Sequence, residues 1–559
     1  MVCSYCSADN ADGEVFCTEC GRPLKKQEKK KKGTVRKKYR ADGSTVCCLA
    51  KNSVPIEESL DDVIYFPNAQ QFIEGKYELI FYKQQGISLS DYLMQKSKIP
   101  GSVIRSLGNR ILYILNKVQK RAILVGSCDL DDFFLVDENP EKMVLRAVRP
   151  FISLKRPHIP QEYECGEFAA PEIKNEDLTR IKKSTDVYLA ALILNRILIG
   201  DKYIVGDIES QLFWAYNYTN FVFGNTYRKY HYWLGKCLSM FPGKRERDVE
   251  ACLKTFERCC GMDEHADLGT LTILDVLETN VGTGKKAMMQ SSGRDKAEWN
   301  EDVIEKWENI EKGFAAYLLA DGISNCDIGS GYVASNIIRK NFIKVLTENI
   351  NADFEDLTYD LVEQMAYQIV GLSNSAIWEE SLKYPETSGN IMGSTFIFLV
   401  IYEGGMYYYS LGDSLLYLIR NGNMIPLNSP DNAGFLALKN GKSYAEYRKM
   451  EGKDNIAIYV GGEYARAQSK YYTDRSVETI ALKSGDIVLA SSDGVLDYYG
   501  TKISDTKWEK ENALAQNLMD RKKSLNERAQ AIIRRDNKNG GGDNLSVILI
   551  EVEGGKDNE

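Results

Sequence analysis

The C-terminal half of the chain shows two kinds of hydrophobic pattern. Short apolar runs, Ile487 to Ala490 and Leu545 to Val552, predict strands that are buried in a core. Two longer stretches, VASNIIRKNFIKVLTENI (333–350) and LTYDLVEQMAYQIVGL (357–372), repeat apolar residues at spacings of three and four, which predicts helices with one face in the core. Strands and helices mixed in this way predict an α+β fold.

Acidic residues stand at the ends of the predicted strands. The run Ile487 to Ala490 leads into Asp493-Gly494, and the apolar run of GFAAYLLADGIS ends in Asp321-Gly322. A single Asp-Gly pair is most simply a turn, because Gly accepts a positive φ and Asp bonds its own backbone. The repetition indicates more than a turn, because the ends of antiparallel strands can meet at one rim, where divalent cations would relieve the repulsion between carboxylates. The acidic residues in such positions are Glu301, Asp302, Asp321, Asp413, Asp493 and Asp543.

The chemistry open to this half of the chain is limited by its residue types. It contains no His after residue 265, which excludes Ser-His-Asp and Cys-His hydrolases here and argues against a zinc centre with His ligands. Oxygen ligands alone favour Mg²⁺ or Mn²⁺. A pair of such ions suits hydrolysis at phosphorus, because the ions clamp phosphoryl oxygens and activate a bound water.

Six strings in this half, in order, resemble the type 2C metal-dependent Ser/Thr protein phosphatases of bacteria: WNED, ADGIS…GYVAS, GSTFIFLV, SLGDSLLYLI, SGDIVLASSDGVLD and GGDNLSVILI. The resemblance implies an α/β/β/α sandwich that hydrolyses phosphoserine and phosphothreonine in proteins with a dinuclear Mg²⁺ or Mn²⁺ centre and a metal-activated water. It implies catalytic roles for Asp321, Asp493 and Asp543. Asp321 would bridge two ions, and the Gly322 carbonyl would bind one of them. Asp493 and Asp543 would hold the other ion, Glu301 or Asp302 would act through water, and Asp413 would bind a further, weaker ion.

The sequence departs from that family at three places. Ala297 stands where the family has a phosphate-binding Arg, which leaves the nearby Arg294 and Lys296 as candidates for that role. The loop after Asp321-Gly322 reads ISNCDIGSG and lacks the usual Gly-Gly, and Leu415 replaces an Arg in the Gly-Asp-Ser turn. The alternative function is therefore a catalytically weak phosphatase-like module that signals or scaffolds by binding proteins.

The N-terminus carries Cys3, Cys6, Cys17 and Cys20 in a CxxC-x10-CxxC spacing. Two such pairs can close a tetrahedral Zn²⁺ site, and so short a segment has no core to fold around without metal. We therefore predict a structural zinc ribbon over residues 1–24. The basic run that follows predicts a disordered linker over residues 25–40.

Residues 41–265 contain strings that resemble the eukaryotic-type protein kinase fold: AILVGSCDLDDFFLVDE, FAAPEI and STDVYLAALIL. Gly126-Ser127-Cys128 replaces the family's His-Arg-Asp, Phe133 replaces its metal-binding Asn, and LRAVRPFIS has no Asp. Phosphoryl transfer needs those groups. The resemblance thus implies a pseudokinase domain that binds or regulates, with a Ser/Thr kinase or its substrate as partner. An unrelated α/β domain is the alternative.

Length and composition place these segments in one multidomain protein of 559 residues, with the phosphatase-like domain over residues 266–559. The net charge of −8 argues against nucleic acid as a partner and leaves phosphoproteins as the expected substrates. No apolar run is long enough to span a membrane. The odd number of cysteines, 13, fits a reducing cytoplasm better than a disulfide framework.

Overall fold

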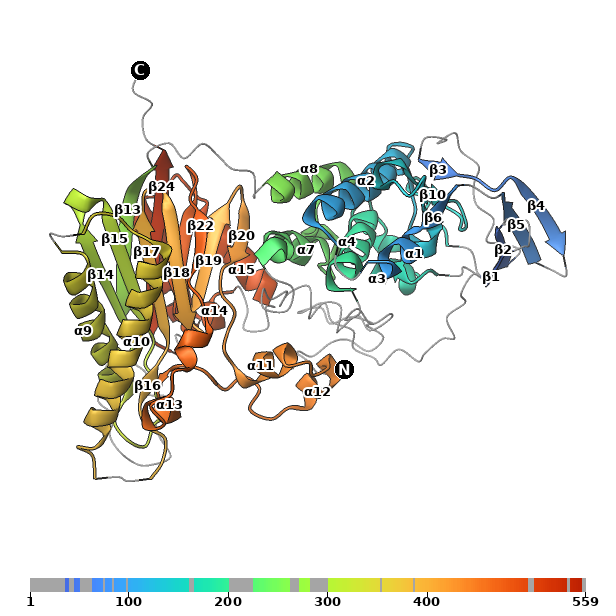
Figure 1. Cartoon of the computed structure of the whole chain (residues 1–559). Coiled ribbons are helices and arrows are strands. Elements are labelled where there is room, and N and C mark those ends of the chain that lie inside the picture. The colour runs from blue at the N-terminus through green and yellow to red at the C-terminus, as the bar shows by residue number, and fades with distance from the viewer. Residues whose placement is uncertain are drawn as a thin grey trace, which may run out of the picture. The chain divides into compact units, whose positions relative to one another are not determined.

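The chain divides into two compact units in a computed structural model, shown in Figure 1. The first unit comprises Met1–Tyr218 and Phe223–Asp263, and the second Thr219–Val222 and Glu264–Glu559. The structure describes residues 36–39, 45–50, 63–73, 76–82, 85–96, 99–159, 165–200, 225–261, 271–281, 300–351, 354–385, 388–500, 507–539 and 543–554. Among these residues, no helix combines the length and the apolar character that crossing a bilayer demands.

Two five-stranded antiparallel sheets form the centre of the second unit. The first sheet consists, in spatial order, of β14 (Val303–Asn309), β15 (Phe314–Ala320), β17 (Phe396–Tyr402), β18 (Gly405–Leu411) and β22 (Glu478–Ala481). The second consists of β13 (Leu271–Val281), β24 (Leu545–Gly554), β23 (Ile487–Ser491), β19 (Leu415–Arg420) and β20 (Asn423–Pro426). The predicted strands 487–490 and 545–552 are confirmed as β23 and β24.

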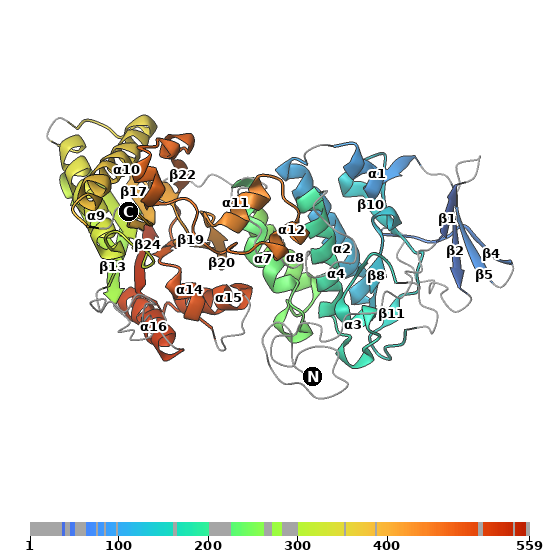
Figure 2. The ribbon, with the colours of Figure 1, turned by 90° about the horizontal axis from the view of Figure 1, so that it is seen from below.

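Helices cover the outer face of each sheet (Figures 1 and 2). Helices α9 (Gly331–Asn349) and α10 (Tyr359–Ser381) pack on the first sheet, and α14 (Gly494–Tyr498), α15 (Lys507–Leu518) and α16 (Leu525–Lys538) belong to the second. Every residue of β15 is buried. Its even-numbered residues pack in one core with α9 and α10, so strand alternation turns Ala315, Tyr317 and Leu319 to the opposite face. A strand buried on both faces needs a continuous apolar sequence, which is why FAAYLLA shows no alternation.

The two predicted core helices are confirmed as α9 and α10. The second helix continues to Ser381, beyond the predicted end at residue 372. The reason is that Ser373, Asn374 and Ile377 extend the buried face by further turns.

The first unit contains two four-stranded sheets and a group of helices. One sheet has the order β1 (Arg36–Tyr39), β2 (Thr45–Ala50), β5 (Lys76–Phe81), β4 (Ala69–Ile73), and the other β3 (Ile64–Tyr65), β10 (Met143–Arg146), β9 (Phe133–Val136), β6 (Gly86–Ser88). The main helices are α2 (Gly101–Lys120), α4 (Ser184–Ile199), α7 (His231–Cys237) and α8 (Val249–Cys260). Arg36–Tyr39, the last part of the predicted disordered linker, is instead strand β1, because backbone pairing with β2 does not depend on the basic side chains.

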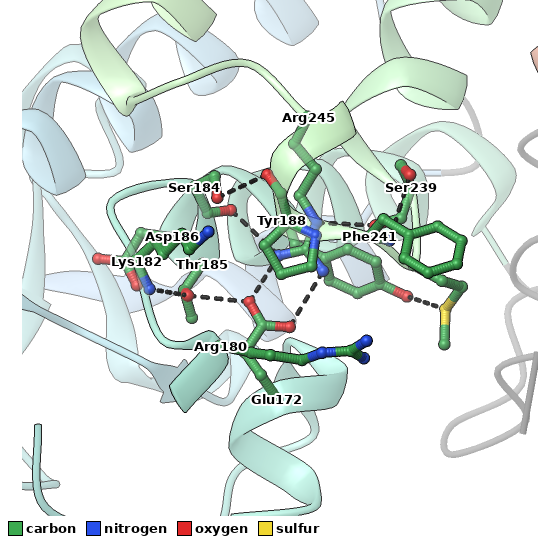
Figure 3. Close-up of polar contacts among 12 residues, drawn as sticks. Glu172, Arg180, Lys182, Ser184, Thr185, Asp186, Tyr188, Ser239, Phe241 and Arg245 are labelled. Carbon is green, nitrogen blue, oxygen red and sulfur yellow. Dashed lines mark hydrogen bonds and ion pairs between the residues drawn. The ribbon is translucent and has the colours of Figure 1, made fainter. Parts of the chain in front are cut away.

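A buried polar network joins distant parts of the first unit (Figure 3). Arg245 donates to both carboxylate oxygens of Glu172, at 2.6 and 3.0 Å, and the Thr185 hydroxyl donates to the same carboxylate at 2.8 Å. Asp186 accepts the backbone N–H groups of Val125 and Gly126, each at 2.9 Å. Burial raises the pKa of Asp186 to about 7.

Candidate metal centre

The acidic strand ends of the second unit lie where its two sheets meet. The Glu301 N–H, just before β14 of the first sheet, donates to Asn544 Oδ1, just before β24 of the second, at 2.9 Å. Antiparallel pairing places Val303 opposite Ala320, so Asp302 and Asp321 are neighbours at one end of the first sheet. Pairing of Ser491 with Val547 brings Asp493 close to Asp543 at an end of the second sheet.

Asp321 is held by the backbone and side chain of Thr395. Its N–H donates to the Thr395 hydroxyl at 2.9 Å, and its carbonyl accepts the Thr395 N–H at 2.8 Å. The Ser394 hydroxyl donates to the same carbonyl at 2.9 Å. These bonds fix the backbone at the end of β15, from which the carboxylate projects.

Ser492 and Ser546 tie Asp493 to the start of β24. The Ser546 N–H donates to the Ser492 hydroxyl at 3.0 Å, and the Ser492 N–H donates to the Ser546 carbonyl at 3.2 Å. Asp493 follows Ser492 directly and precedes the first residue of α14. The two serines therefore set the distance between the segments that carry Asp493 and Asp543.

The glycines of the two Asp-Gly pairs allow close backbone approach. A Cβ on Gly322 would lie 2.4 Å from the backbone of Gly331, at the start of α9, and one on Gly494 would lie 2.6 Å from the Asn544 carbonyl oxygen. Neither glycine has a positive φ, so neither Asp-Gly pair is the turn that its sequence most simply suggests. Glycine is needed here because a side chain would separate the segments that carry the carboxylates.

The structure distinguishes Glu301 from Asp302. The Glu301 carboxylate accepts the Ser324 hydroxyl in a short hydrogen bond. Asp302 is buried, with the side chains of Ser546, Asp321 and Ser492 as neighbours. Burial raises the pKa of Asp302 to about 6, although these neighbours act in the opposite direction. Asp302 is therefore one of the carboxylates that surround Asp321. Glu301 lies beside the same segment, since its carbonyl accepts the Gly322 N–H at 3.2 Å, and its role as a ligand stays a prediction.

Mutual repulsion marks this group of carboxylates. Burial raises the pKa of Asp321 well above its ordinary value, and the neighbouring charges of Asp302, Asp493, Asp543 and Asp413 raise it further. Burial also raises the pKa of Asp493, again with neighbouring aspartates adding to the effect. Acidic groups that oppose one another's ionisation in a buried place form a site that a cation would stabilise.

Asp413 reaches the group from the connection between β18 and β19. These strands belong to different sheets, so the predicted Gly-Asp-Ser turn joins the two sheets and is not a hairpin. Burial raises the pKa of Asp413 to about 6, and the charges of Asp431, Asp497 and Asp543 contribute. Asp413 thus lies near Asp543 and on the side of the group that faces Asp431.

These residues fit hard divalent cations by donor chemistry, because all are oxygen donors from separate segments at one rim. As the side chains stand, however, no three His, Cys, Asp or Glu residues in the described ranges are arranged to hold an ion together. Binding would require the side chains to turn toward a shared ion.

Several predicted residues lie outside the part of the chain that the structure describes. These are the four cysteines of the zinc ribbon, Cys3, Cys6, Cys17 and Cys20, and the two candidate phosphate ligands, Arg294 and Lys296. Their roles stay predictions.

Sequence reasoning missed the polar residues that position the carboxylates. Asn544 could have been found, because it directly follows Asp543 and stands before a strand. Thr395, Ser492 and Ser546 carry no comparable signal, because Ser and Thr are common in strands and next to them, and only their partners identify these three.

No family model matches the chain, but a search among characterised proteins finds bacterial relatives. Serine/threonine phosphatase stp of Listeria innocua is 23% identical over 254 residues, which is 45% of this chain and 90% of that protein. Protein phosphatase PhpP of Streptococcus pneumoniae is 23% identical over 257 residues, 45% of this chain and 92% of that protein. A Streptococcus pyogenes protein is 25% identical over 255 residues, which is 45% of this chain and 92% of that protein. Its name assigns it provisionally to the 2C-type protein phosphatases.

Solved structures give a weaker comparison. The serine/threonine phosphatase of S. agalactiae covers 50% of this chain and 99% of its own at 21% identity and a TM-score of 0.38. The catalytic domain of the phosphatase PstP, in complex with two manganese ions, covers 51% of this chain and all of its own at 17% identity and a TM-score of 0.34. Scores this low establish nothing by themselves, so the relationship rests on sequence: over 45% of its length the chain is a distant homologue of bacterial serine/threonine protein phosphatases of the 2C type.

Proposed function

We propose that the second unit hydrolyses phosphoserine and phosphothreonine in proteins, with Mg²⁺ or Mn²⁺ as cofactor. The observation that carries this proposal is the gathering of Asp302, Asp321, Asp493 and Asp543 from four strand ends where two sheets meet. The distant homology to bacterial Ser/Thr phosphatases supports it.

The proposed ligands of two ions are Asp321, the Gly322 carbonyl, Asp493 and Asp543, with Asp302 acting beside them and Asp413 contributing to a further ion. Bound ions of this kind supply a nucleophilic water at neutral pH and neutralise charge on the phosphoryl oxygens. Asp321, which lies beside Asp302, Asp493 and Asp543, would orient that water. Thr395, Ser394 and Ser492 hold the backbone of Asp321 and Asp493, so the acidic groups keep their positions during the reaction.

The substrate phosphate needs a cationic group as well. Ala297 stands where the related family has Arg, and we propose that Arg294 or Lys296 takes this role. An Arg would bind two phosphate oxygens at once, whereas a Lys would act as a point charge.

A phosphopeptide assay with the full chain tests the function. We expect release of phosphate that depends on added Mn²⁺ and that falls at least 100-fold in Asp493→Asn, because this change removes a charged ligand. Asp454→Asn is the control, since the Asp454 side chain is 80% exposed and its removal leaves turnover unchanged. A protein that binds Mn²⁺ but releases no phosphate from any phosphopeptide would support the alternative, a phosphatase-like module that signals by binding.

We further propose that the first unit is a kinase-like domain that binds a partner and transfers no phosphate. Support comes from contacts of the strings that resemble kinases. Glu172 of FAAPEI pairs with Arg245 (Figure 3), and Asp186 of STDVYLAALIL accepts the backbone N–H of Gly126 in AILVGSCDLDDFFLVDE. At the loop itself, Arg149 is paired with both Asp129 and Asp132. Pairing with this guanidinium neutralises both carboxylates, which makes them weaker ligands for a metal ion. The test is whether MgATP changes the unfolding temperature of this unit, and we expect no change.

A further inference from the structure

The segment between β20 and β22 leaves the two sheets and returns (Figure 1). It contains α11 (Ala433–Lys439), α12 (Tyr444–Lys449), β21 (Val460–Gly461) and α13 (Gly462–Arg466). Asp431 lies at its start and Arg475 at its end. The segment is therefore a loop of helices whose two ends come together beside the sheets.

Asp431 and Arg475 close this segment with a two-armed ion pair. Arg475 Nη1 donates to Asp431 Oδ2 at 2.7 Å, and Nη2 donates to Oδ1 in a short bond. The Asp431 side chain is 7% exposed and that of Arg475 is 26% exposed. A bidentate pair in such a place defines both distance and orientation.

The same two residues hold the chain immediately before Asp413. Asp431 Oδ2 accepts the Gly412 N–H at 3.0 Å, and the Asp431 N–H donates to the Gly412 carbonyl at 3.0 Å. Arg475 Nη1 donates to the Ser410 carbonyl at 3.1 Å. Gly412 has a φ of +102°, which a residue with a side chain rarely adopts, so this turn depends on such outside support.

Tyrosine hydroxyl groups fix the backbone around Arg475. Tyr367 of α10 donates to the Arg475 carbonyl at 2.5 Å, and Tyr409 of β18 donates to the Tyr472 carbonyl at 2.7 Å. The backbone that carries the guanidinium is thus held by hydrogen bonds from α10 and β18, independently of Asp431. Within the turn 412–415 itself no residue carries a positive charge.

We propose that Asp431 and Arg475 are positioning residues that hold the Gly412–Asp413 turn in the orientation in which Asp413 binds a divalent cation. This inference rests on the proposed function, since it concerns a proposed ligand of the same centre. Arg475 acts in two ways: it orients Asp431, which grips Gly412, and it compensates the Asp431 charge next to Asp413. Without the guanidinium, Asp431 would turn away or add its uncompensated charge to a site that is already acidic.

The test measures Mn²⁺ binding to the full metal-free chain by calorimetry and by the electron paramagnetic resonance of free Mn²⁺. Asp413→Asn identifies the binding step to which Asp413 contributes. In Arg475→Met we expect that step to weaken about 10- to 100-fold, as for residues that support metal ligands, with the remaining steps unchanged. Arg475→Lys keeps the charge but loses one arm, so its loss should be smaller.

Arg420→Met is the matched control. Arg420 makes a two-armed pair with Asp486 that is more buried than Asp431–Arg475 and lies at the opposite end of β19 from Asp413. Its removal costs stability and leaves every Mn²⁺ step unchanged. A weakening shared by Arg420→Met and Arg475→Met would show a general loss of structure and overturn the proposal.

Each remaining outcome also supports or overturns the proposal. If Asp413→Asn leaves Mn²⁺ binding unaltered, or if Arg475→Met binds as the wild type does, the proposal is wrong. If Arg475→Met does not fold, unaltered binding in Arg475→Lys overturns it and weakened binding supports it. A wild-type chain that binds no Mn²⁺ removes both this inference and the proposed function, whereas binding without phosphatase turnover removes only the function.

Discussion

At the scale of single residues, four buried aspartates of the second unit show two contrasting environments. Asp431 and Asp486 are each neutralised by an arginine that binds both carboxylate oxygens. Asp321 and Asp493 lie beside other carboxylates, whose charges raise their pKa values. Asp431 and Asp486 are thus paired with cations, whereas Asp321 and Asp493 are grouped with other carboxylates, which costs stability unless a cation binds.

Asp536 on α16 is buried, and neither of its carboxylate oxygens has a hydrogen-bond partner among the described residues. Burial raises its pKa from 3.8 to about 8, although Arg535 and Lys510 act in the opposite direction. Between pH 4 and pH 8 the carboxyl group therefore ionises in the unfolded chain and keeps its proton in the folded chain, so its contribution to stability falls as the pH rises.

Asp536→Asn has no such titration. We predict that the free energy of unfolding of the variant, relative to wild type, rises between pH 5 and pH 8. The slope should be about 1 kcal/mol per pH unit, since a single group can contribute no more than about 1.4 kcal/mol per pH unit. Urea unfolding at several pH values measures this difference. The exposed Asp454→Asn should show no comparable trend, and a flat difference for Asp536→Asn would contradict the pKa assignment.

At the scale of elements, α9 and α10 cover one face of the first sheet and share a hydrophobic core with it. Phe342 of α9 meets Phe398 of β17 edge-on at 6.0 Å between ring centroids, and both are fully buried. Polar residues on the other side of α9 face water, as its pattern of apolar residues predicts. The periodicity of 333–350 and 357–372 was sufficient to predict both helices, because it follows from local geometry alone.

Two isoleucines on α9 provide a matched comparison. Ile338 is fully buried and Ile343 is 39% exposed. We predict that Ile338→Ala lowers the free energy of unfolding by about 2–5 kcal/mol, because it leaves a cavity under the helix. Ile343→Ala should change it by about 0.5 kcal/mol or less. Similar losses for both variants in denaturant unfolding would contradict the assigned face of the helix.

At the scale of the whole molecule, the chain consists of two units, each with its own buried core. Only the second contains the candidate metal centre. A ligand that binds one folded unit stabilises that unit by mass action and leaves an independent unit unaffected.

Calorimetry of the full chain should therefore resolve a transition that Mn²⁺ shifts upward and one that it does not. At a concentration roughly 100 times Kd the stabilisation is about 2.7 kcal/mol. Asp493→Asn should abolish the shift, which assigns that transition to the second unit. The midpoint of the other transition should be the same in MgATP as in MgCl₂. A nucleotide-dependent shift would show that the first unit binds MgATP despite the pairing of Arg149 with Asp129 and Asp132, and would contradict the prediction.

The sequence by itself determined the local features of this protein: the apolar runs of β23 and β24, the helical faces of α9 and α10, and the acidic residues at strand ends. Each depends on residues a few positions apart. The tertiary structure decided which carboxylates meet. Strand β13, near the start of the second unit in sequence, pairs with β24, near its end, and the Asp413 turn connects the two sheets. It also decided that Asp302 lies among the carboxylates around Asp321, and that Asp431, paired with Arg475, holds Gly412. Such choices depend on the packing of segments far apart in the chain, for which no single stretch of sequence carries a signal.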